Sequence, residues 1–532
     1  MPSLLNLRGH RLAVVRIALV VLPAFLLFGY NQSSTGGILG YPPFVHTFPE
    51  IDTVDAKGGN KVHKATIQGT VVAIYTIGCL FGALFAVPLG NRYGRRRALA
   101  VHAVVGIIGQ TLQASSFSLA QLIVGRIVTG LGVGGINALV PVWQSECTKP
   151  KSRGRNVVVI GIFVATGQAM ASWVNYGLGV IPHSQVAWRL PLAIPIIFIL
   201  MLLASVFFFP ESPVWLAQKG RINEATHVYA ILDDMADDSD ELRIKATAVF
   251  DSFEIHRQRT VKGWARILSK RQEEEFYRAC LAFAVNFNAQ MTGANGVTYY
   301  ANTIFTESLH FATREAAVLS ASLLSWKILV CLIPLMIVDR YGRKPLFIIS
   351  GSGMSLAMVS LAATVSQLDH SVGSGRAAVF FLFLYMTFFP VGYLGANFLY
   401  ATEIGVSELR VHFSAIGTAT HWLFNFVIAE IIPTCFASIG YQTYIIFAVI
   451  SAATVPLVLF IFPETKGRSL EQIDEIFFSA DKWYKVTRDF KRSSPQDMES
   501  SGTADGKIER VHASPDEKEA EDTEEIEDMS TN

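Results

Sequence analysis

Twelve long apolar runs constrain this chain more than any other feature of its sequence. A helix needs about 20 mostly apolar residues to cross the hydrocarbon core of a bilayer. The sequence therefore predicts an all-α membrane protein with 12 transmembrane helices. The predicted spans cover residues 12–30, 66–90, 98–116, 119–141, 157–179, 188–209, 279–301, 316–338, 345–366, 377–402, 412–436 and 442–462.

The composition agrees with a chain embedded in a lipid bilayer and excludes several other classes. Charged residues make up 16% of the 532 residues, whereas an ordinary soluble protein has about 25%. Lysine plus arginine number 44 and aspartate plus glutamate 43, so the balanced charge predicts no nucleic-acid partner. The five cysteines are widely and irregularly spaced, which predicts neither a disulfide framework nor a zinc site.

No motif in the sequence predicts an enzyme, a nucleotide-driven pump or a bound cofactor. The chain has no phosphate-binding GxxxxGK[ST] loop. His102 and His421 are isolated and have no acidic partners at catalytic or metal-ligand spacing. We therefore expect a protein that is not an enzyme and that uses neither a cofactor nor a metal ion.

Short basic loops alternate with loops that carry no lysine or arginine. Because positive loops stay on the cytoplasmic side, we expect these loops and both termini in the cytoplasm, most simply of the plasma membrane. The first apolar run ends in the polar stretch GYNQSSTGG and not in a small-residue cleavage site, so we expect a retained helix. The basic loop residues are Arg92, Arg95, Arg96, Arg97, Lys149, Lys151, Arg153, Arg155, Arg340, Arg343 and Lys344.

Three patterns recur in the same order in both halves of the chain. NRYGRR at 91–96 returns as DRYGRK at 339–344, and PESP at 210–213 returns as PETK at 463–466. A glutamate followed seven residues later by an arginine also occurs twice, after the fourth span of each half. Two related halves around a midplane site are typical of alternating-access transporters. We expect six-helix bundles at 1–209 and 277–462, a cytoplasmic linker with short helices at 210–276, and a cytoplasmic tail at 463–532 that is disordered toward its end.

Charged residues at the predicted cytoplasmic ends have two possible roles. Ion pairs that form in one conformation and break in another bias a two-state equilibrium, which would make these residues a cytoplasmic gate. The alternative is that the positive charges only fix the orientation in the membrane. The candidate gate residues are Arg92, Arg95, Arg96, Glu146, Arg153, Arg155, Asp339, Arg340, Arg343, Glu403 and Arg410.

Several of these motifs resemble those of the sugar porter family of the major facilitator superfamily, and the charged central loop, the short outer loops and the motif THWLFNF look most like fungal sugar porters. The resemblance runs from the first span to residue 474. It implies two pseudo-symmetric six-helix bundles that carry a sugar or related polyol by alternating access. The matching motifs are GNRYGRRR, GRIVTGLGVGG, PVWQSE, PESPVWL, QMTGANGVTYY and FPETKGRSLEQID.

Polar or aromatic side chains from four predicted helices, the aromatic one being Trp422, reach one level near the middle of the membrane. At a rise of about 1.5 Å per residue, Gln168 lies ~20 Å from the basic end of its span, and Gln290 and Lys327 lie ~18 Å from theirs. Polar groups at this depth are costly unless they face the bundle interior or a wet cavity. Amides also match sugar hydroxyls, because both donate and accept hydrogen bonds.

The resemblance implies a substrate-binding set at this level and shows four departures from the family pattern. Ala289, Phe398, His421 and Lys327 replace residues that usually contact the sugar, and Lys327 adds a cation that suits a sugar acid. Lys327 could instead be a structural charge paired with an acidic or carbonyl group. For the amides and aromatic residues, interhelical hydrogen bonding and plain packing are the alternatives. The candidate substrate-binding residues are Gln168, Gln290, Asn295, Tyr299, Tyr300, Lys327, Phe398, Trp422 and Asn425.

The position that couples transport to protons in the family carries an asparagine here. Proton-driven members have an aspartate in the first span near an arginine of the fourth; the corresponding residues here are Asn31 and Arg126. Because an amide does not titrate, the resemblance favours facilitated diffusion over proton symport. Glu430, an acid inside the eleventh span, keeps proton-coupled symport of a sugar or sugar acid open as an alternative. A nutrient sensor that does not transport is the third hypothesis.

Overall fold

The computed structural model describes most of the chain and is helical wherever it forms regular structure. The described residues are 7–53, 56, 58–147, 153–181, 184–235, 240, 242–244, 247, 250, 267, 273–368, 372–405, 410–466, 468, 473 and 476–477, and no strand occurs among them. Most of the predicted tail at 463–532, including its predicted disorder, lies outside these residues. Much of the predicted linker at 210–276 does as well.

The N half consists of six rods, two of which contain more than one helical segment. α1 (Gly9–Arg16), a π-helical turn (Ile17–Val21) and α2 (Leu22–Ile38) form one continuous rod. The short α3 (Pro42–Thr47) connects this rod to the second one. The other rods are α4 (Gly59–Tyr93), α5 (Arg95–Ala114), α6 (Leu119–Glu146), α7 (Arg153–Leu178), and α8 (Val186–Ala193) with α9 (Pro195–Val206).

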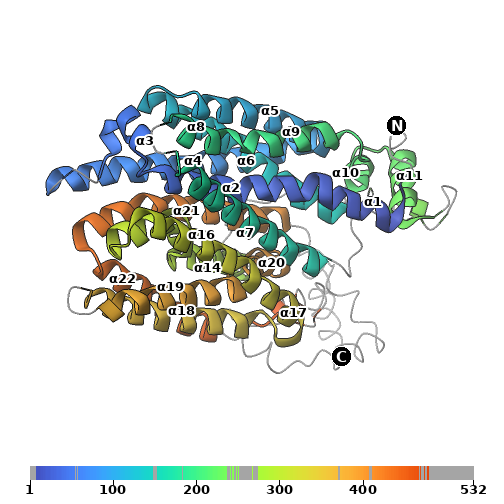
Figure 1. Cartoon of the computed structure of the whole chain (residues 1–532). Coiled ribbons are helices and arrows are strands. Elements are labelled where there is room, and N and C mark those ends of the chain that lie inside the picture. Colours follow the sequence, from blue (N-terminus) through green and yellow to red (C-terminus); the bar gives the residue numbers. More distant parts are fainter. Residues whose placement is uncertain are drawn as a thin grey trace, which may run out of the picture.

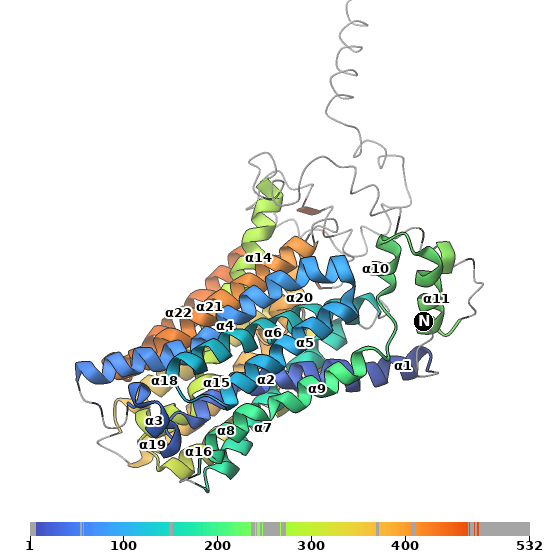
Figure 2. The ribbon, with the colours of Figure 1, turned by 90° about the horizontal axis from the view of Figure 1, so that it is seen from above.

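The C half repeats this plan, and three of its six rods are interrupted. The rods are α14 (Glu273–Met291) with α15 (Ala294–Thr303), α16 (Thr313–Val330) with α17 (Leu332–Tyr341), α18 (Arg343–Val365), α19 (Val372–Gly392) with α20 (Ala396–Glu403), α21 (Arg410–Ile439) and α22 (Gln442–Ile461). Figure 1 shows the blue-to-teal N half above the yellow-to-orange C half. The helices α10 (Pro213–Gln218) and α11 (Ile222–Asp233) lie beyond one end of the bundle, near α1 (Figure 2).

The described residues include nine helices that are long and apolar enough to cross a membrane. The remaining three predicted spans correspond to α5, α7 and the interrupted rod α14–α15. The predicted first span was too short, because the helix continues from residue 30 to Ile38 through polar residues. These polar residues are buried inside the protein, so their polarity does not end the helix.

Glycines with positive φ angles produce the main breaks and turns. Gly293 (φ +86°) separates α14 from α15, and Gly395 (φ +102°) precedes α20. Gly94 (φ +92°) and Gly342 (φ +91°) form equivalent turns in the two RYGR copies. Residues with a Cβ rarely adopt this conformation, which explains why glycine stands at each of these positions.

Glycine also allows the helices of the N half to pack with their backbones in close approach. A Cβ atom on Gly134 of α6 would lie 2.1 Å from the carbonyl oxygen of Cys79 on α4. Small residues permit such contacts between helices in a membrane, where dispersion replaces the hydrophobic effect as the driving force. The two halves meet along α2 and α15, α4 and α21, and α7 and α16.

We predict that Gly134→Val destabilises the protein and that Gly177→Val does not. The added side chain at Gly134 would collide with the α4 backbone, whereas nothing lies within 4 Å of a Cβ at Gly177 on α7. Overpacking of this kind costs about 1–3 kcal/mol or more. Thermal unfolding of the two purified variants in detergent measures the difference. Equal melting temperatures would show that the α4–α6 contact is looser than described.

Candidate transport site

A chain of hydrogen bonds joins the two halves in the middle of the bundle. Gln168 on α7 donates from Nε2 to Oε1 of Gln32 on α2, at 2.6 Å. Gln32 in turn donates from Nε2 to the hydroxyl of Tyr299 on α15, at 3.3 Å. All three side chains are buried. Gln32 is not among the predicted substrate-binding residues, because the predicted first span ends at residue 30.

Several polar atoms in this region have no hydrogen-bond partner within the described protein. Asn425 on α21 makes a weak contact with the Tyr299 hydroxyl, but neither its Oδ1 nor its Nδ2 has a partner in good hydrogen-bond geometry. Oε1 of Gln168 is also unpartnered. Because buried polar atoms are normally satisfied, this group of unmatched donors and acceptors suits water or a hydroxylated solute.

A second polar chain lies within the C half, next to an aromatic cluster. Asn295 donates from Nδ2 to Oε1 of Gln290 at 2.7 Å, and Nε2 of Gln290 lies 2.8 Å from Nδ1 of His421. Since the Gln290 oxygen already accepts a hydrogen bond, its nitrogen donates and Nδ1 of His421 accepts. The His421 ring contacts the rings of Phe398 and Trp422 at centroid distances of 4.9 and 5.3 Å.

Trp422 connects this cluster to the N half, whereas Tyr300 and Lys327 face other neighbours. The Trp422 ring packs edge-on against Phe28 of α2 at 5.4 Å. Tyr300 donates to the carbonyl oxygen of Ala429 at 2.8 Å and is thereby held against α21. Nζ of Lys327 lies 3.4 Å from Oγ1 of Thr298. The predicted binding residues therefore fall into separate groups. Gln168 and Tyr299 belong to the hydrogen-bond chain between the halves, and Gln290 and Asn295 belong to the chain within the C half. Tyr300 contacts α21, and Lys327 contacts Thr298.

The predicted coupling position consists of neutral groups around a buried arginine. Arg126 donates to Oγ1 of Thr35 and, at 2.8 Å, to the carbonyl oxygen of Val72. Asn31 accepts a hydrogen bond from Gln110 at 2.6 Å. Among the hydrogen bonds and ion pairs that the structure describes, none joins Asn31 or a carboxylate to Arg126.

Contacts between the halves are concentrated at the end of the bundle where α4 begins, which we call the opposite end. Lys61 pairs with Glu307 at 3.5 Å, and the hydroxyls of Thr66 and Thr434 are 3.0 Å apart. Deeper along the same contact, Thr70 donates to Oε1 of Glu430 at 2.6 Å. A Cβ on Gly69 would lie 2.4 Å from the Glu430 carbonyl oxygen, so α4 and α21 are in backbone contact here.

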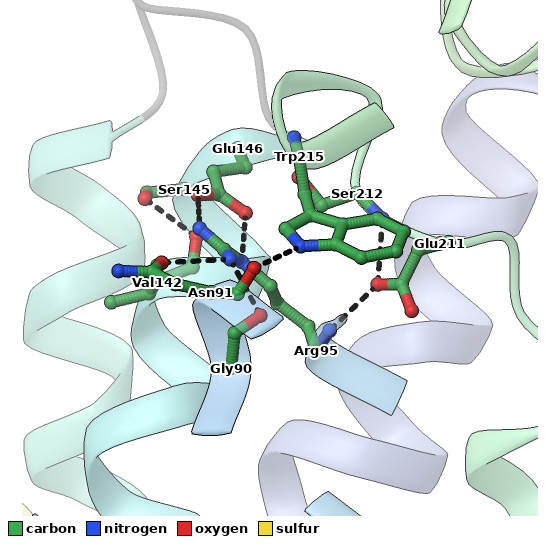
Figure 3. A network of polar contacts seen from close by, with 9 residues as sticks. All are labelled: Gly90, Asn91, Arg95, Val142, Ser145, Glu146, Glu211, Ser212 and Trp215. Carbon is green, nitrogen blue, oxygen red and sulfur yellow. Dashed lines mark hydrogen bonds and ion pairs between the residues drawn. The ribbon is translucent and has the colours of Figure 1, made fainter. Parts of the chain in front are cut away.

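The other end, which we call the basic end, carries the RYGR turns and an arginine network (Figure 3). Arg95 donates to both carboxylate oxygens of Glu146, at 3.0 and 2.6 Å, and to the Gly90 carbonyl oxygen. Trp215 of α10 donates from its indole to the Asn91 carbonyl oxygen at 3.0 Å. The network therefore joins α4, α5, α6 and α10, all on the N-terminal side of the chain.

Two glutamates that we did not predict as site residues cap the helices that follow the RYGR turns. Glu211 of the PESP motif accepts from the backbone N–H groups of Arg95 and Arg96, at 3.0 and 3.2 Å. Burial raises the pKa of Glu211, and these N–H groups act in the opposite direction. Anionic groups at a helix N-terminus satisfy its free N–H groups and its dipole. The recurrence of the PESP motif was the sequence signal for this role.

The C half repeats the arginine–glutamate pair and the capping carboxylate. Arg343 donates to Glu403 at 2.8 Å, and Glu464 of the PETK motif accepts from the backbone N–H groups of Arg343 and Lys344, at 3.0 and 2.9 Å. Where both residues are described, the ion pairs at the basic end join helices within one half and do not cross between halves.

The remaining candidate gate residues are either exposed or outside the described side chains. Arg92 and Arg340 lie over the rings of Tyr93 and Tyr341, and neither makes a described ion pair. Arg96 donates to the Phe207 carbonyl oxygen at 2.6 Å. The side chains of Arg153, Arg155, Asp339 and Arg410 lie outside the described part of the structure.

Two six-rod halves with interrupted helices and a polar site between them define a membrane carrier of the major facilitator type. The family model "Sugar (and other) transporter" matches residues 17–477, and the chain belongs to this family. It is therefore a multi-pass membrane transporter and not an enzyme. Among the described residues, no group of three or more His, Cys, Asp or Glu side chains could hold a metal ion.

Similar proteins cover nearly the whole chain. The chain is 31% identical to "Sugar transporter STL1" of Saccharomyces cerevisiae, over 92% of this chain and 86% of that protein. It is 34% identical to MFS-type transporter oryC of Aspergillus oryzae, over 87% and 85% of the two chains. The proton:xylose symporter XylE bound to 6-bromo-6-deoxy-D-glucose has a similar fold, with a TM-score of 0.71, 23% identity, and coverage of 87% of this chain and 99% of that chain.

We predict that Glu211→Ala lowers the thermal stability and that Glu224→Ala leaves it nearly unchanged. The first substitution leaves two backbone N–H groups of α5 without their acceptor, at a cost of about 1–2 kcal/mol. Glu224 makes only an exposed ion pair with Arg221, and such pairs contribute about 0.5 kcal/mol or less. Melting temperatures of both variants in detergent test this, and a larger loss for Glu224→Ala would contradict the capping role.

Proposed function

We propose that the protein carries a sugar or related polyol by facilitated diffusion and alternating access. The observation that carries this proposal is the set of buried, unmatched polar atoms on Gln168 and Asn425, which lie beside the Gln32–Tyr299 link between the halves. Sugar hydroxyls both donate and accept hydrogen bonds, so they can satisfy amide oxygens and nitrogens together. Trp422 and Phe398 supply flat apolar faces for the C–H surface of a sugar.

Each half has the internal bonds that it needs to move as a unit. The Arg95–Glu146 and Arg343–Glu403 pairs, with their capping glutamates, hold the helix ends together within each half. The described polar contacts across the opposite end are hydroxyl and carboxylate hydrogen bonds and one partly exposed ion pair, alongside the backbone contact of α4 with α21 at Gly69. We infer that these contacts break when the site opens toward that end, while the networks at the basic end persist as structural clamps.

The surroundings of Arg126 support facilitated diffusion. Its described partners are a hydroxyl, a carbonyl and an amide, none of which exchanges a proton near neutral pH. XylE is named a proton:xylose symporter. The proton coupling that the family resemblance implies uses an acid at the position that Asn31 occupies in this chain, and an asparagine side chain does not titrate. Proton-coupled symport remains the second candidate because Oε2 of Glu430 is buried without a hydrogen-bond partner.

The orientation and the boundaries are part of the same proposal. We place the basic end in the cytoplasm, because positive loops are retained there, and the protein in the plasma membrane. We divide the chain into bundles at 1–209 and 277–462, a linker at 210–276 and a tail at 463–532. These assignments make the opposite end the extracellular gate.

We predict that Asn425→Ala lowers hexose or polyol transport without lowering the melting temperature. Neither amide atom of Asn425 has a partner in good hydrogen-bond geometry within the described protein, so truncation removes only its weak contact with the Tyr299 hydroxyl. Loss of one hydrogen bond to the substrate lowers the transport efficiency roughly three- to tenfold. Uptake of labelled hexoses and polyols into proteoliposomes, without an ion gradient, measures the effect.

The matched control is Asn60→Ala, which removes an exposed amide at the start of α4 and leaves uptake unchanged. If Asn425→Ala lowers stability but not uptake, Asn425 has a structural role and the proposed site is wrong. If wild-type uptake requires an inward proton gradient, facilitated diffusion is wrong and the symport candidate replaces it.

A further inference from the structure

Lys327 is a completely buried lysine in the last turn of α16, near the middle of the rod that α16 and α17 form. Its exposed fraction is 0%. The described contacts of Nζ are one long hydrogen bond of 3.4 Å to Oγ1 of Thr298 and the face of the Phe389 ring at 5.2 Å. An ammonium group has three N–H donors, so these contacts leave most of its hydrogen-bonding capacity unused.

No described carboxylate lies within ion-pair distance of Lys327. The sequence left open that Lys327 pairs with an acidic or carbonyl group. Among the described residues, its partners are instead the hydroxyl of Thr298 and the ring of Phe389. Among the described residues, the only carboxylate as deeply buried is Glu275, which lies in the first turn of α14 at the basic end. A buried cation without a counter-charge is costly, and an ionisable residue inside the membrane indicates a functional site.

The position of Lys327 connects it to the proposed transport site. Thr298 lies three residues after Asn295 on α15, so it is about one helical turn, roughly 5 Å, farther along the same helix. Asn295 belongs to the amide chain with Gln290. A solute that bonds to this chain can therefore extend a substituent toward the Lys327 ammonium.

The N half adds a second positive charge without a described acid. Arg126 is 1% exposed, and its described partners are the neutral groups of Thr35, Val72 and Gln113. Both halves thus present positive charge toward the interior of the bundle. In a region of low dielectric constant, this charge favours an anionic solute over a neutral one of the same shape.

We propose that Lys327 binds the carboxylate of a polyhydroxylated monocarboxylate and makes this anion the preferred substrate of the carrier. The inference rests on the proposed function, because the hydroxyl groups of the substrate would occupy the amide site. The ammonium would donate charge-assisted hydrogen bonds to the carboxylate oxygens. Thr298 and Phe389 position the lysine side chain from two neighbouring helices.

The test compares gluconate with glucitol, which differ only in a terminal carboxylate or hydroxymethyl group. Binding to the purified full-length protein is measured by calorimetry, and uptake of both labelled compounds and of neutral hexoses is measured in proteoliposomes. We expect wild-type protein to bind gluconate at least about tenfold more tightly than glucitol. Lys327→Asn removes this preference, so that gluconate binds no more tightly than glucitol, whereas Lys327→Arg retains the preference.

The control is Lys219→Asn, the same chemical change at an exposed site after α10, which leaves the preference intact. Equal binding of gluconate and glucitol by wild-type protein overturns the inference even if Lys327→Asn does not fold. A preference that persists in folded Lys327→Asn overturns it as well. If neutral hexoses are carried while gluconate neither binds nor moves, only this inference fails; if no compound is carried, the proposed function fails too.

Discussion

The structure depends on the fact that the hydrocarbon core of a membrane supplies no hydrogen-bond partner. Every polar group within the bundle must find its partner in the protein or in a bound solute. Several buried amides do so, as Asn31 does with Gln110 and Gln290 with Asn295. The amide atoms without a partner include both of Asn425 and Oε1 of Gln168, beside the link between the halves, and others on Asn137, Asn175, Asn288 and Asn302. Among these positions, the one beside the Gln32–Tyr299 link combines groups from both halves, which favours it as the substrate site.

The bonding within each half contrasts with the bonding between them. At the basic end, each half has a bidentate or charge-assisted arginine–glutamate pair and a carboxylate that caps a helix. At the opposite end, the halves share the hydrogen bonds of Thr53, Thr66 and Thr70 and the Lys61–Glu307 pair. Individual hydrogen bonds of this kind contribute about 1 kcal/mol each. Thermal energy and substrate binding can therefore reverse the closure while the halves stay intact.

The sequence was sufficient to predict the family and the two-half fold, which the family match and the structural similarity confirm. The fixed rise of a helix per residue also selects amides at one depth, and their role in substrate binding stays a prediction. It did not predict Gln32, because polar residues inside a buried helix look like a loop in a hydropathy profile. It did not assign roles to Glu211 and Glu464, because their partners are backbone N–H groups of helices more than a hundred residues away in the chain.

The central claim is that substrate on the side of the opposite end reaches a site shared by both halves only when that end opens. Thr66 and Thr434 provide the most direct test, because their hydroxyls are 3.0 Å apart across the two halves. Both residues are replaced by cysteine in a chain whose five native cysteines have been removed, and uptake is measured after oxidation and again after reduction. The account predicts that oxidation stops uptake, that reduction restores it, and that neither single-cysteine variant responds. Unchanged uptake by the cross-linked protein would contradict the account.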